Sequence, residues 1–93
     1  MDTDISDPDA EEIDCTGKYI FLGFIDAHAH FNLHVAGTVT SDNFETGTAA
    51  AIAGGTTFVI DFGTQYHGET LKEGLQNWHD MANENGPNSC DYS

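Results

Sequence analysis

The chain has 93 residues, about one small domain, with 16 acidic against 2 basic residues and a formal net charge of −14. Nucleic acids and membrane surfaces are excluded as partners, because binding to either requires clustered Lys and Arg. A hydrophobic content of 39% also excludes a wholly disordered chain.

The first fourteen residues hold seven of the sixteen acids and no basic residue, a pattern typical of a disordered, solvated tail. They lack the basic start and apolar run of a secretory signal, and no stretch approaches the roughly 18 apolar residues of a membrane span. We therefore expect a cytoplasmic protein, with Cys15 and Cys90 reduced and buried. The acids outside the tail indicate either a salt-adapted source or balancing charge elsewhere.

The first predicted strand carries the main chemical signal. Turn residues lead into a β-rich stretch, Tyr19 to Leu22, which predicts the end of a strand before Gly23. Residues 24–30 then alternate as a strand does, the first of the predicted sheet, so one face of this strand carries Asp26, His28 and His30. Polar groups are costly to bury unpaired, so this face either meets water or binds a ligand.

Strands and helices alternate through the rest of the chain. Residues 31–40 are predicted as a loop, and Asp42 and Glu45 as the capping box of a helix over 43–53. The apolar run in residues 56–62 predicts a strand buried on both faces. The expected inward stripe of the first helix is Phe44, Thr48, Ala51 and Ile52.

A second capping box, Thr70 and Glu73, starts the next helix, and residues 89–93 predict a third strand. The order β-α-β-α-β indicates an α/β fold with a parallel sheet. The expected inward stripe of the second helix is Leu71, Leu75, Trp78 and Ala82.

His28 and His30 have a spacing that suits a metal. Their backbone positions are roughly 6.7 Å apart along a strand, so both imidazoles can turn toward one cation. A catalytic zinc normally takes three protein ligands plus water, so the pair supplies only part of a site. Taken alone, the pair is equally compatible with two surface histidines.

The sequence around the pair, Gly17 to Phe31, closely resembles the first barrel strand of the amidohydrolase superfamily, with its Gly-x-Ile-Asp-x-His-x-His pattern. Further short motifs, over roughly residues 12–93, resemble the dihydropyrimidinase and hydantoinase family. Leu22 and Ala27 depart from residues common there, and neither change removes a ligand. The further motifs are Gly37 to Thr40, Asp42 to Phe44, Gly47 to Ala51, Ala53 to Thr57, Ile60 to Phe62, Gly68 and Glu69, Trp78, and Cys90 to Tyr92.

The resemblance implies a TIM (β/α)8 barrel, of which this chain would hold the first two and a half β/α units. We expect an acidic disordered tail at 1–14, the end of a small β-domain or its connection at 15–22, and a partial barrel at 23–93. Such a barrel takes about 250 residues. We therefore expect an incomplete fragment that neither folds cooperatively nor catalyses by itself.

The resemblance also implies hydrolysis of the cyclic amide bond of 5,6-dihydropyrimidines, a small-molecule substrate, by a cytoplasmic homotetramer with two Zn²⁺ per subunit. His28 and His30 would bind the more buried metal. The carboxylated Lys that bridges the metals, two more His and an Asp would follow Ser93, as would a Tyr that polarises the substrate carbonyl. Phe31, Leu33 and Val35 would line the substrate pocket.

Two alternatives stay open: a D-hydantoinase acting on 5-substituted hydantoins, and a non-catalytic scaffold relative. The scaffold relatives typically lack the second histidine, so His30 favours an enzyme. Allantoinases and dihydroorotases carry an Arg soon after the pair, and this chain does not. Other polar residues are assigned non-ligand roles: His34, His67 and His79 as exposed, Asp61 as structural, Asp26 as orienting its neighbours, and Trp78 as helix packing.

Overall fold

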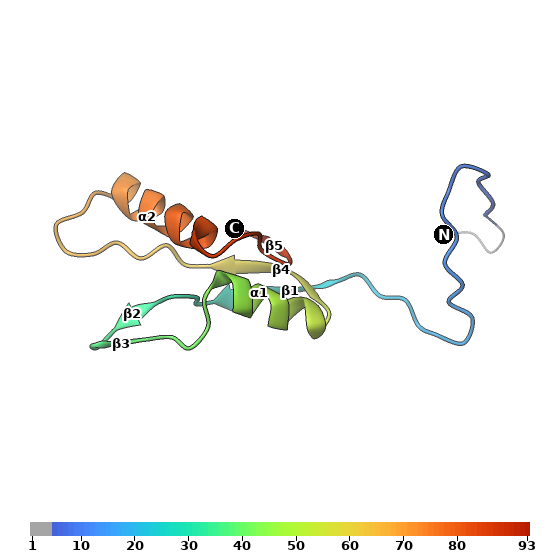
Figure 1. Cartoon of the computed structure of the whole chain (residues 1–93), viewed down its shortest axis with the longest axis horizontal. Helices are drawn as coiled ribbons and strands as arrows, with labels where there is room; N and C mark the ends of the chain where they lie inside the picture. The colour runs from blue at the N-terminus through green and yellow to red at the C-terminus, as the bar shows by residue number, and fades with distance from the viewer. Residues whose placement is uncertain (1–4) are drawn as a thin grey trace.

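A computed structural model of the chain describes residues 5–93, and the predicted tail's residues 1–4 lie outside that range (Figure 1). A parallel three-stranded sheet forms its centre, in the order β1-β4-β5. The bounds are Phe24–Ala29 for β1, Thr56–Asp61 for β4 and Asp91–Tyr92 for β5. The expected α/β architecture with a parallel sheet is confirmed.

Two helices connect the strands, α1 over Phe44–Ala53 and α2 over Leu71–Glu84. They contact each other through Phe44 and Trp78, whose rings meet edge to face at 5.6 Å. The α1 cap differs from the prediction, because Asn43 rather than Asp42 accepts the N–H of Thr46. Both residues are good caps, and the helix begins at the one with extended backbone whose side chain reaches the third residue.

Residues 31–40 form a short hairpin, so the predicted loop was wrong in detail. Strands β2 (His34–Val35) and β3 (Thr38–Val39) pair antiparallel across a two-residue turn. Ala36 and Gly37 have φ of 51° and 79°, as a type I′ turn requires. Glycine suits this geometry and alanine rarely adopts it, which is why the sequence signal was weak.

The core is small and lies on one face of the sheet. Phe44, Val59, Trp78 and Ala82 are at most 5% exposed. The opposite face, which carries Ile60, is not covered by the described residues, so the prediction of a strand buried on both faces was wrong. Three positions expected to face inward are also largely exposed: Ile52, Leu71 and Leu75.

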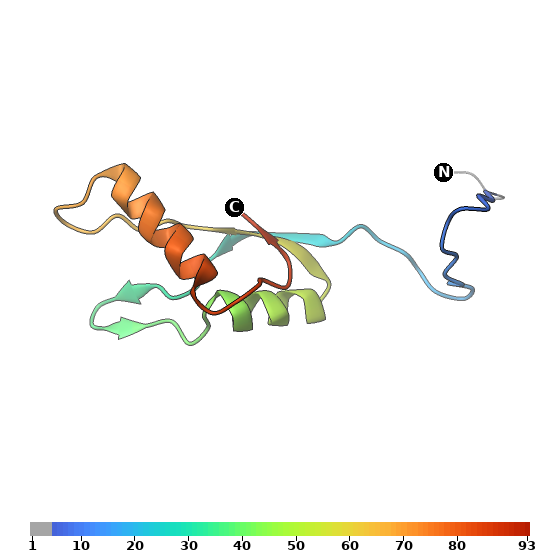
Figure 2. The same ribbon diagram turned by 45° about the horizontal axis from the view of Figure 1, so that its top comes forward.

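Upstream of β1, residues 5–23 extend away from the sheet without a strand (Figure 2). The strand expected at Tyr19 to Leu22 is absent, because a strand needs a hydrogen-bonding neighbour and the described residues offer none. Tyr19 and Leu22 are 91% and 92% exposed. The extended arm gives the chain a radius of gyration of 18.1 Å, against about 12 Å for a compact domain of this length.

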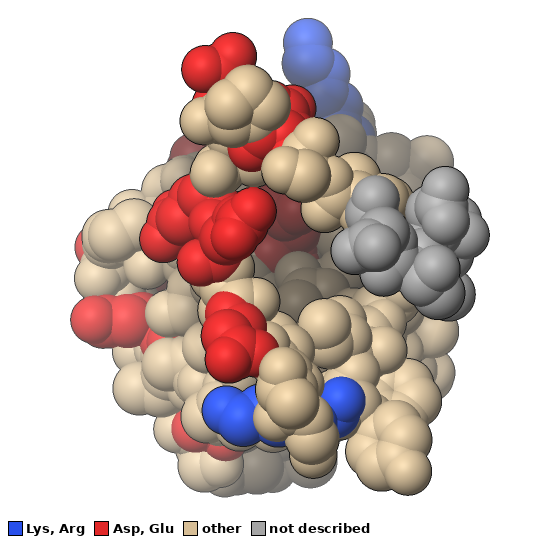
Figure 3. Space-filling model, turned by 90° about the vertical axis from the view of Figure 1, so that its right-hand side faces the viewer, with Lys and Arg blue, Asp and Glu red and all other residues tan. Residues whose placement is uncertain are grey.

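Uncharged residues cover most of the face seen from the side of this arm, and among the charged side chains there the acidic ones are more prominent than the basic ones (Figure 3). Among the described residues, no helix is both long and apolar enough to cross a bilayer. Cys15 and Cys90 are free thiols, as expected, but both are half-buried rather than buried. Burial, followed by the charge of Asp91, raises the pKa of Cys90.

The predicted capping box at the start of α2 is present, and its contribution to stability can be tested. Thr70 accepts the N–H of Glu73, and its own N–H and hydroxyl donate to the Glu73 carboxylate at 2.7 Å, which lowers the pKa of Glu73. In the full-length protein that carries this segment, Thr70→Ala is expected to lower the free energy of unfolding by about 1 kcal/mol. Urea unfolding would measure it.

Thr70→Ser is the matched control, since it keeps the hydroxyl. A group with a lowered pKa stabilises the folded state above its unfolded pKa and loses that effect as pH falls. The difference in the free energy of unfolding between Thr70→Ala and Thr70→Ser should therefore become smaller as the pH falls through the lowered pKa of Glu73. Equal unfolding midpoints at neutral pH would contradict the role of the hydroxyl.

Candidate metal centre

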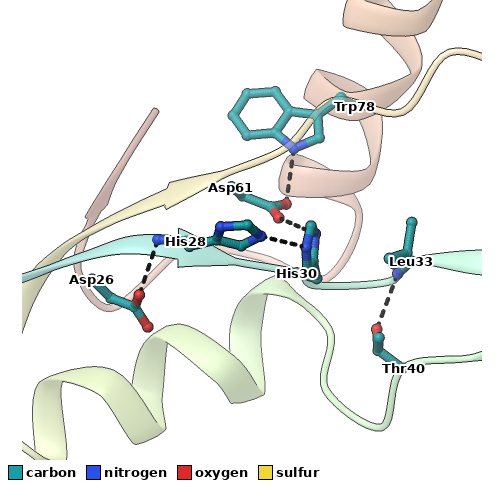
Figure 4. A network of polar contacts seen from close by, with 7 residues as sticks. All are labelled: Asp26, His28, His30, Leu33, Thr40, Asp61 and Trp78. Atoms are coloured by element: carbon teal, nitrogen blue, oxygen red, sulfur yellow. Dashed lines mark hydrogen bonds and ion pairs between the residues drawn. The ribbon is translucent and has the colours of Figure 1, made fainter.

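The carboxyl end of β1 holds both predicted ligands. His28 lies in β1 and His30 directly follows it, and their Nε2 atoms are 3.1 Å apart (Figure 4). The alternation of β1 turns Ala29, which is buried, toward the helices and both imidazoles toward the opposite face. The polar face predicted from the sequence is therefore the face that the helices leave uncovered.

The spacing of these nitrogens fits a shared metal ion. Two imidazoles bound at about 2.0–2.1 Å to one tetrahedral zinc hold their ligating nitrogens about 3.3 Å apart, close to the observed separation. Imidazole nitrogen is also a donor that zinc prefers. Without a cation, one Nε2–H donates to the other Nε2, so the same geometry is a hydrogen-bonded pair. The residues present fit a metal.

The pair is nevertheless only part of a metal site. Within residues 5–93 no group of three or more His, Cys, Asp or Glu side chains converges as metal ligands would. A catalytic zinc needs a third protein ligand and a water. The described residues therefore bring together two of the ligands that such a centre needs.

Asp61, the last residue of β4, lies behind His30. One carboxylate oxygen accepts the indole N–H of Trp78 at 2.9 Å, and the other is 3.9 Å from Nδ1 of His30 (Figure 4). The Asp61 side chain is 2% exposed, whereas that of His30 is 37% exposed. Its Oδ1 is buried without a hydrogen-bond partner, which costs about 1–3 kcal/mol.

The sequence predicts structural roles for Trp78 and Asp61 but does not predict the hydrogen bond between them. They are 17 positions apart on different elements, so the pairing depends on how α2 crosses β4. One sequence feature could have indicated this bond: a polar residue ends a buried strand, and a Trp lies on the inward stripe of the next helix. Trp78 thus packs in the core, as expected, and also fixes a carboxylate beside a predicted ligand.

Phe62 also contacts the imidazole pair, and no sequence pattern predicted this contact. Its ring lies 4.5 Å from the ring of His28 and 5.4 Å from that of His30, measured between centroids. It follows Asp61 at the end of β4 and is only half-covered itself, at 48% exposure. Phe62 therefore supplies an apolar wall against which both imidazoles rest.

Asp26 orients its own strand rather than the imidazole rings. Its carboxylate accepts the backbone N–H of His28 at 3.1 Å and lies apart from the two rings (Figure 4). The expectation that Asp26 acts through hydrogen bonds is confirmed. The pairing of β1 with β4 is irregular between Asp26 and Ala29, next to this contact.

The three predicted pocket residues lie in and before the β2–β3 hairpin. Phe31 packs edge to face on Phe44 at 5.2 Å and covers Gly47, where a Cβ would collide with its ring. Leu33 is half-buried and exchanges hydrogen bonds with Thr40, and Val35 is 54% exposed. The hairpin extends from the same end of β1 as the imidazoles. The other three histidines, His34, His67 and His79, are exposed as expected.

Comparison with known proteins shows the family to which this chain belongs. Residues 19–83 match the amidohydrolase family. The chain is 52% identical over 73 residues to D-hydantoinase of Geobacillus stearothermophilus, covering 78% of this chain and 16% of that protein. It is 47% identical over 81 residues to dihydropyrimidinase of Dictyostelium discoideum, covering 87% and 16%.

A solved structure gives the same result. The crystal structure of dihydropyrimidinase from Brevibacillus agri superposes with a TM-score of 0.87 at 46% identity, over 97% of this chain and 19% of that one. The chain thus spans about one sixth of the length of the curated relatives described above. It belongs to the amidohydrolase family, among relatives named D-hydantoinase and dihydropyrimidinase.

Proposed function

We propose that this segment is part of a metal-dependent enzyme that hydrolyses the cyclic amide bond of 5,6-dihydropyrimidines. The observation that carries the proposal is the pair of converging imidazoles, 3.1 Å apart at the carboxyl ends of a parallel sheet, in a chain of this family. Active sites of barrels built from such sheets lie at that end. The relative named dihydropyrimidinase supports the substrate class.

In this proposal residues 23–93 are the first two and a half units of a TIM (β/α)8 barrel, residues 15–22 end a small β-domain and 1–14 form an acidic tail. The uncovered sheet face with Ile60 and the imidazoles would then line the barrel interior. The high radius of gyration and the exposed apolar side chains of α2 support a larger assembly around this segment. The complete enzyme would be a cytoplasmic homotetramer.

His28 and His30 would hold one of two Zn²⁺ ions, bridged by a carboxylated Lys outside this segment. When bound, the metal pair supplies a hydroxide at neutral pH and polarises the scissile carbonyl. The chain's own residues orient the ligands: Asp26 fixes the backbone of His28, and Phe62 forms the wall behind both rings. Phe31, Leu33 and Val35 would shape the substrate side of the site.

The test is hydrolysis by the purified full-length protein that carries this segment. We expect ring opening of 5,6-dihydrouracil, loss of the activity after a chelator removes the metal, and recovery with Zn²⁺. A protein that binds zinc but opens neither a dihydropyrimidine nor a hydantoin ring would contradict the proposal and favour the scaffold relatives.

A second substrate class is favoured by a specific observation, the 52% identity to a D-hydantoinase. The two activities break the same kind of cyclic amide bond in rings of different size. Parallel assays with 5,6-dihydrouracil and a 5-substituted hydantoin decide between them by the ratio of kcat/KM values. A ratio in favour of hydantoin would replace the dihydropyrimidinase assignment and leave the chemistry unchanged.

A further inference from the structure

Three described residues form a continuous chain of polar contacts from helix α2 to a predicted metal ligand. The indole N–H of Trp78 donates to Oδ2 of Asp61, and Oδ1 of Asp61 faces Nδ1 of His30 at 3.9 Å. Nε2 of His30 is the atom that meets His28. The two ring nitrogens of His30 therefore face different partners, a carboxylate on one side and the candidate metal position on the other (Figure 4).

The Asp61 carboxylate has one oxygen with a partner and one without. Oδ1 is buried and accepts no hydrogen bond, while Oδ2 is held by a Trp that is itself only 5% exposed. A buried carboxylate oxygen of this kind needs a donor. The His30 side chain is 37% exposed and that of Asp61 only 2%, so His30 is the partner with more freedom to close the 3.9 Å gap between Nδ1 and Oδ1.

We propose that Asp61, held by Trp78, is the positioning residue that keeps the proton of His30 on Nδ1 and so leaves Nε2 free to bind metal. A carboxylate can only accept, so a neutral His30 that faces it must carry its proton on Nδ1. Metal-binding histidines are commonly oriented in this way by a carboxylate behind the ring. This inference rests on the proposed function, because it requires His30 to bind a metal.

Asp61→Asn tests the proton's position rather than the shape of the site. Trp78 still donates to one terminal atom, which must therefore be the amide oxygen. The amide nitrogen then faces Nδ1 of His30, and as a donor it favours the opposite tautomer, with the proton on Nε2. We expect zinc affinity to fall by about 10- to 100-fold, measured by competition with a chromophoric chelator on the full-length protein.

The double variant Asp61→Asn with Trp78→Phe gives a result that a merely structural role would not. Without the indole N–H, the introduced amide is free to turn its oxygen toward His30, which restores the metal-binding tautomer. We expect zinc affinity to recover by about tenfold relative to Asp61→Asn alone, although the double variant carries one more core change. Asp80→Asn, an exposed carboxylate on α2, is the matched control and should not change zinc affinity.

The inference is overturned if Asp61→Asn binds zinc within about twofold of the unsubstituted protein, or if the second substitution weakens binding further. If Asp61→Asn fails to fold, the single variant Trp78→Phe tests the proposal. We expect its zinc affinity to fall by about three- to tenfold, and an unchanged zinc affinity would overturn the proposal. If the unsubstituted protein binds no zinc, the proposed function fails and this inference fails with it. If the unsubstituted protein binds zinc and the Asp61 and Trp78 variants bind it equally well, the positioning role of Asp61 is wrong and the proposed function still stands.

Discussion

His28→Ala and His30→Ala are each expected to abolish hydrolysis and to lower bound zinc in the full-length protein that carries this segment. Each change removes one of the two imidazoles whose Nε2 atoms converge at 3.1 Å. Removing a residue that only orients a ligand typically weakens metal binding or activity by about 10- to 100-fold, so losing the ligand itself should exceed about 100-fold. Initial rates and metal content per subunit, measured by elemental analysis, check this expectation.

His67→Ala is the matched control, because His67 is an exposed imidazole in the loop before α2. It should leave rate and zinc content unchanged. Excess zinc in the assay separates two effects: a rate that recovers at high zinc indicates weakened binding, whereas a rate that stays low indicates a misplaced metal. Normal zinc and normal rates in both His28→Ala and His30→Ala would remove the metal assignment.

The parts of this fold that follow from local sequence pattern were predictable. The alternation in β1 placed both histidines on one face, and the 3.6-residue period located α2 with its cap at Thr70. Such patterns depend only on neighbours in the chain. They carried the prediction as far as two imidazoles sharing one face, and no further.

Contacts between distant elements were not predictable from pattern. The Trp78–Asp61 bond requires the crossing of α2 over β4, and no periodicity encodes that geometry. The turn at Ala36 adopts a positive φ that alanine disfavours, so neighbouring pairs must stabilise it. The Tyr19 to Leu22 stretch has β-rich composition but no strand partner among the described residues, which shows that composition without pairing does not make a strand.

Phe44→Ala is expected to cause the largest loss of stability of any single change in this segment. The Phe44 ring is 1% exposed and makes edge-to-face contacts with Phe31, Trp78 and Tyr92, at centroid distances of 5.2 to 5.7 Å. It thus joins both helices, β5 and the segment after β1. Replacing a buried Phe by Ala lowers the free energy of unfolding by about 3–5 kcal/mol, through lost burial and the cavity left behind.

Urea unfolding of the full-length protein that carries this segment would measure the loss, with Glu45→Ala as the matched control. Glu45 is the next residue of α1 and is exposed, so its replacement should change the free energy of unfolding by no more than about 0.5 kcal/mol. Phe31 contacts Phe44 and directly follows His30 in the chain. The cavity left by Phe44→Ala should therefore also loosen the imidazole pair and lower zinc affinity. Equal effects of the two substitutions would mean that the aromatic cluster does not hold the helices to the sheet.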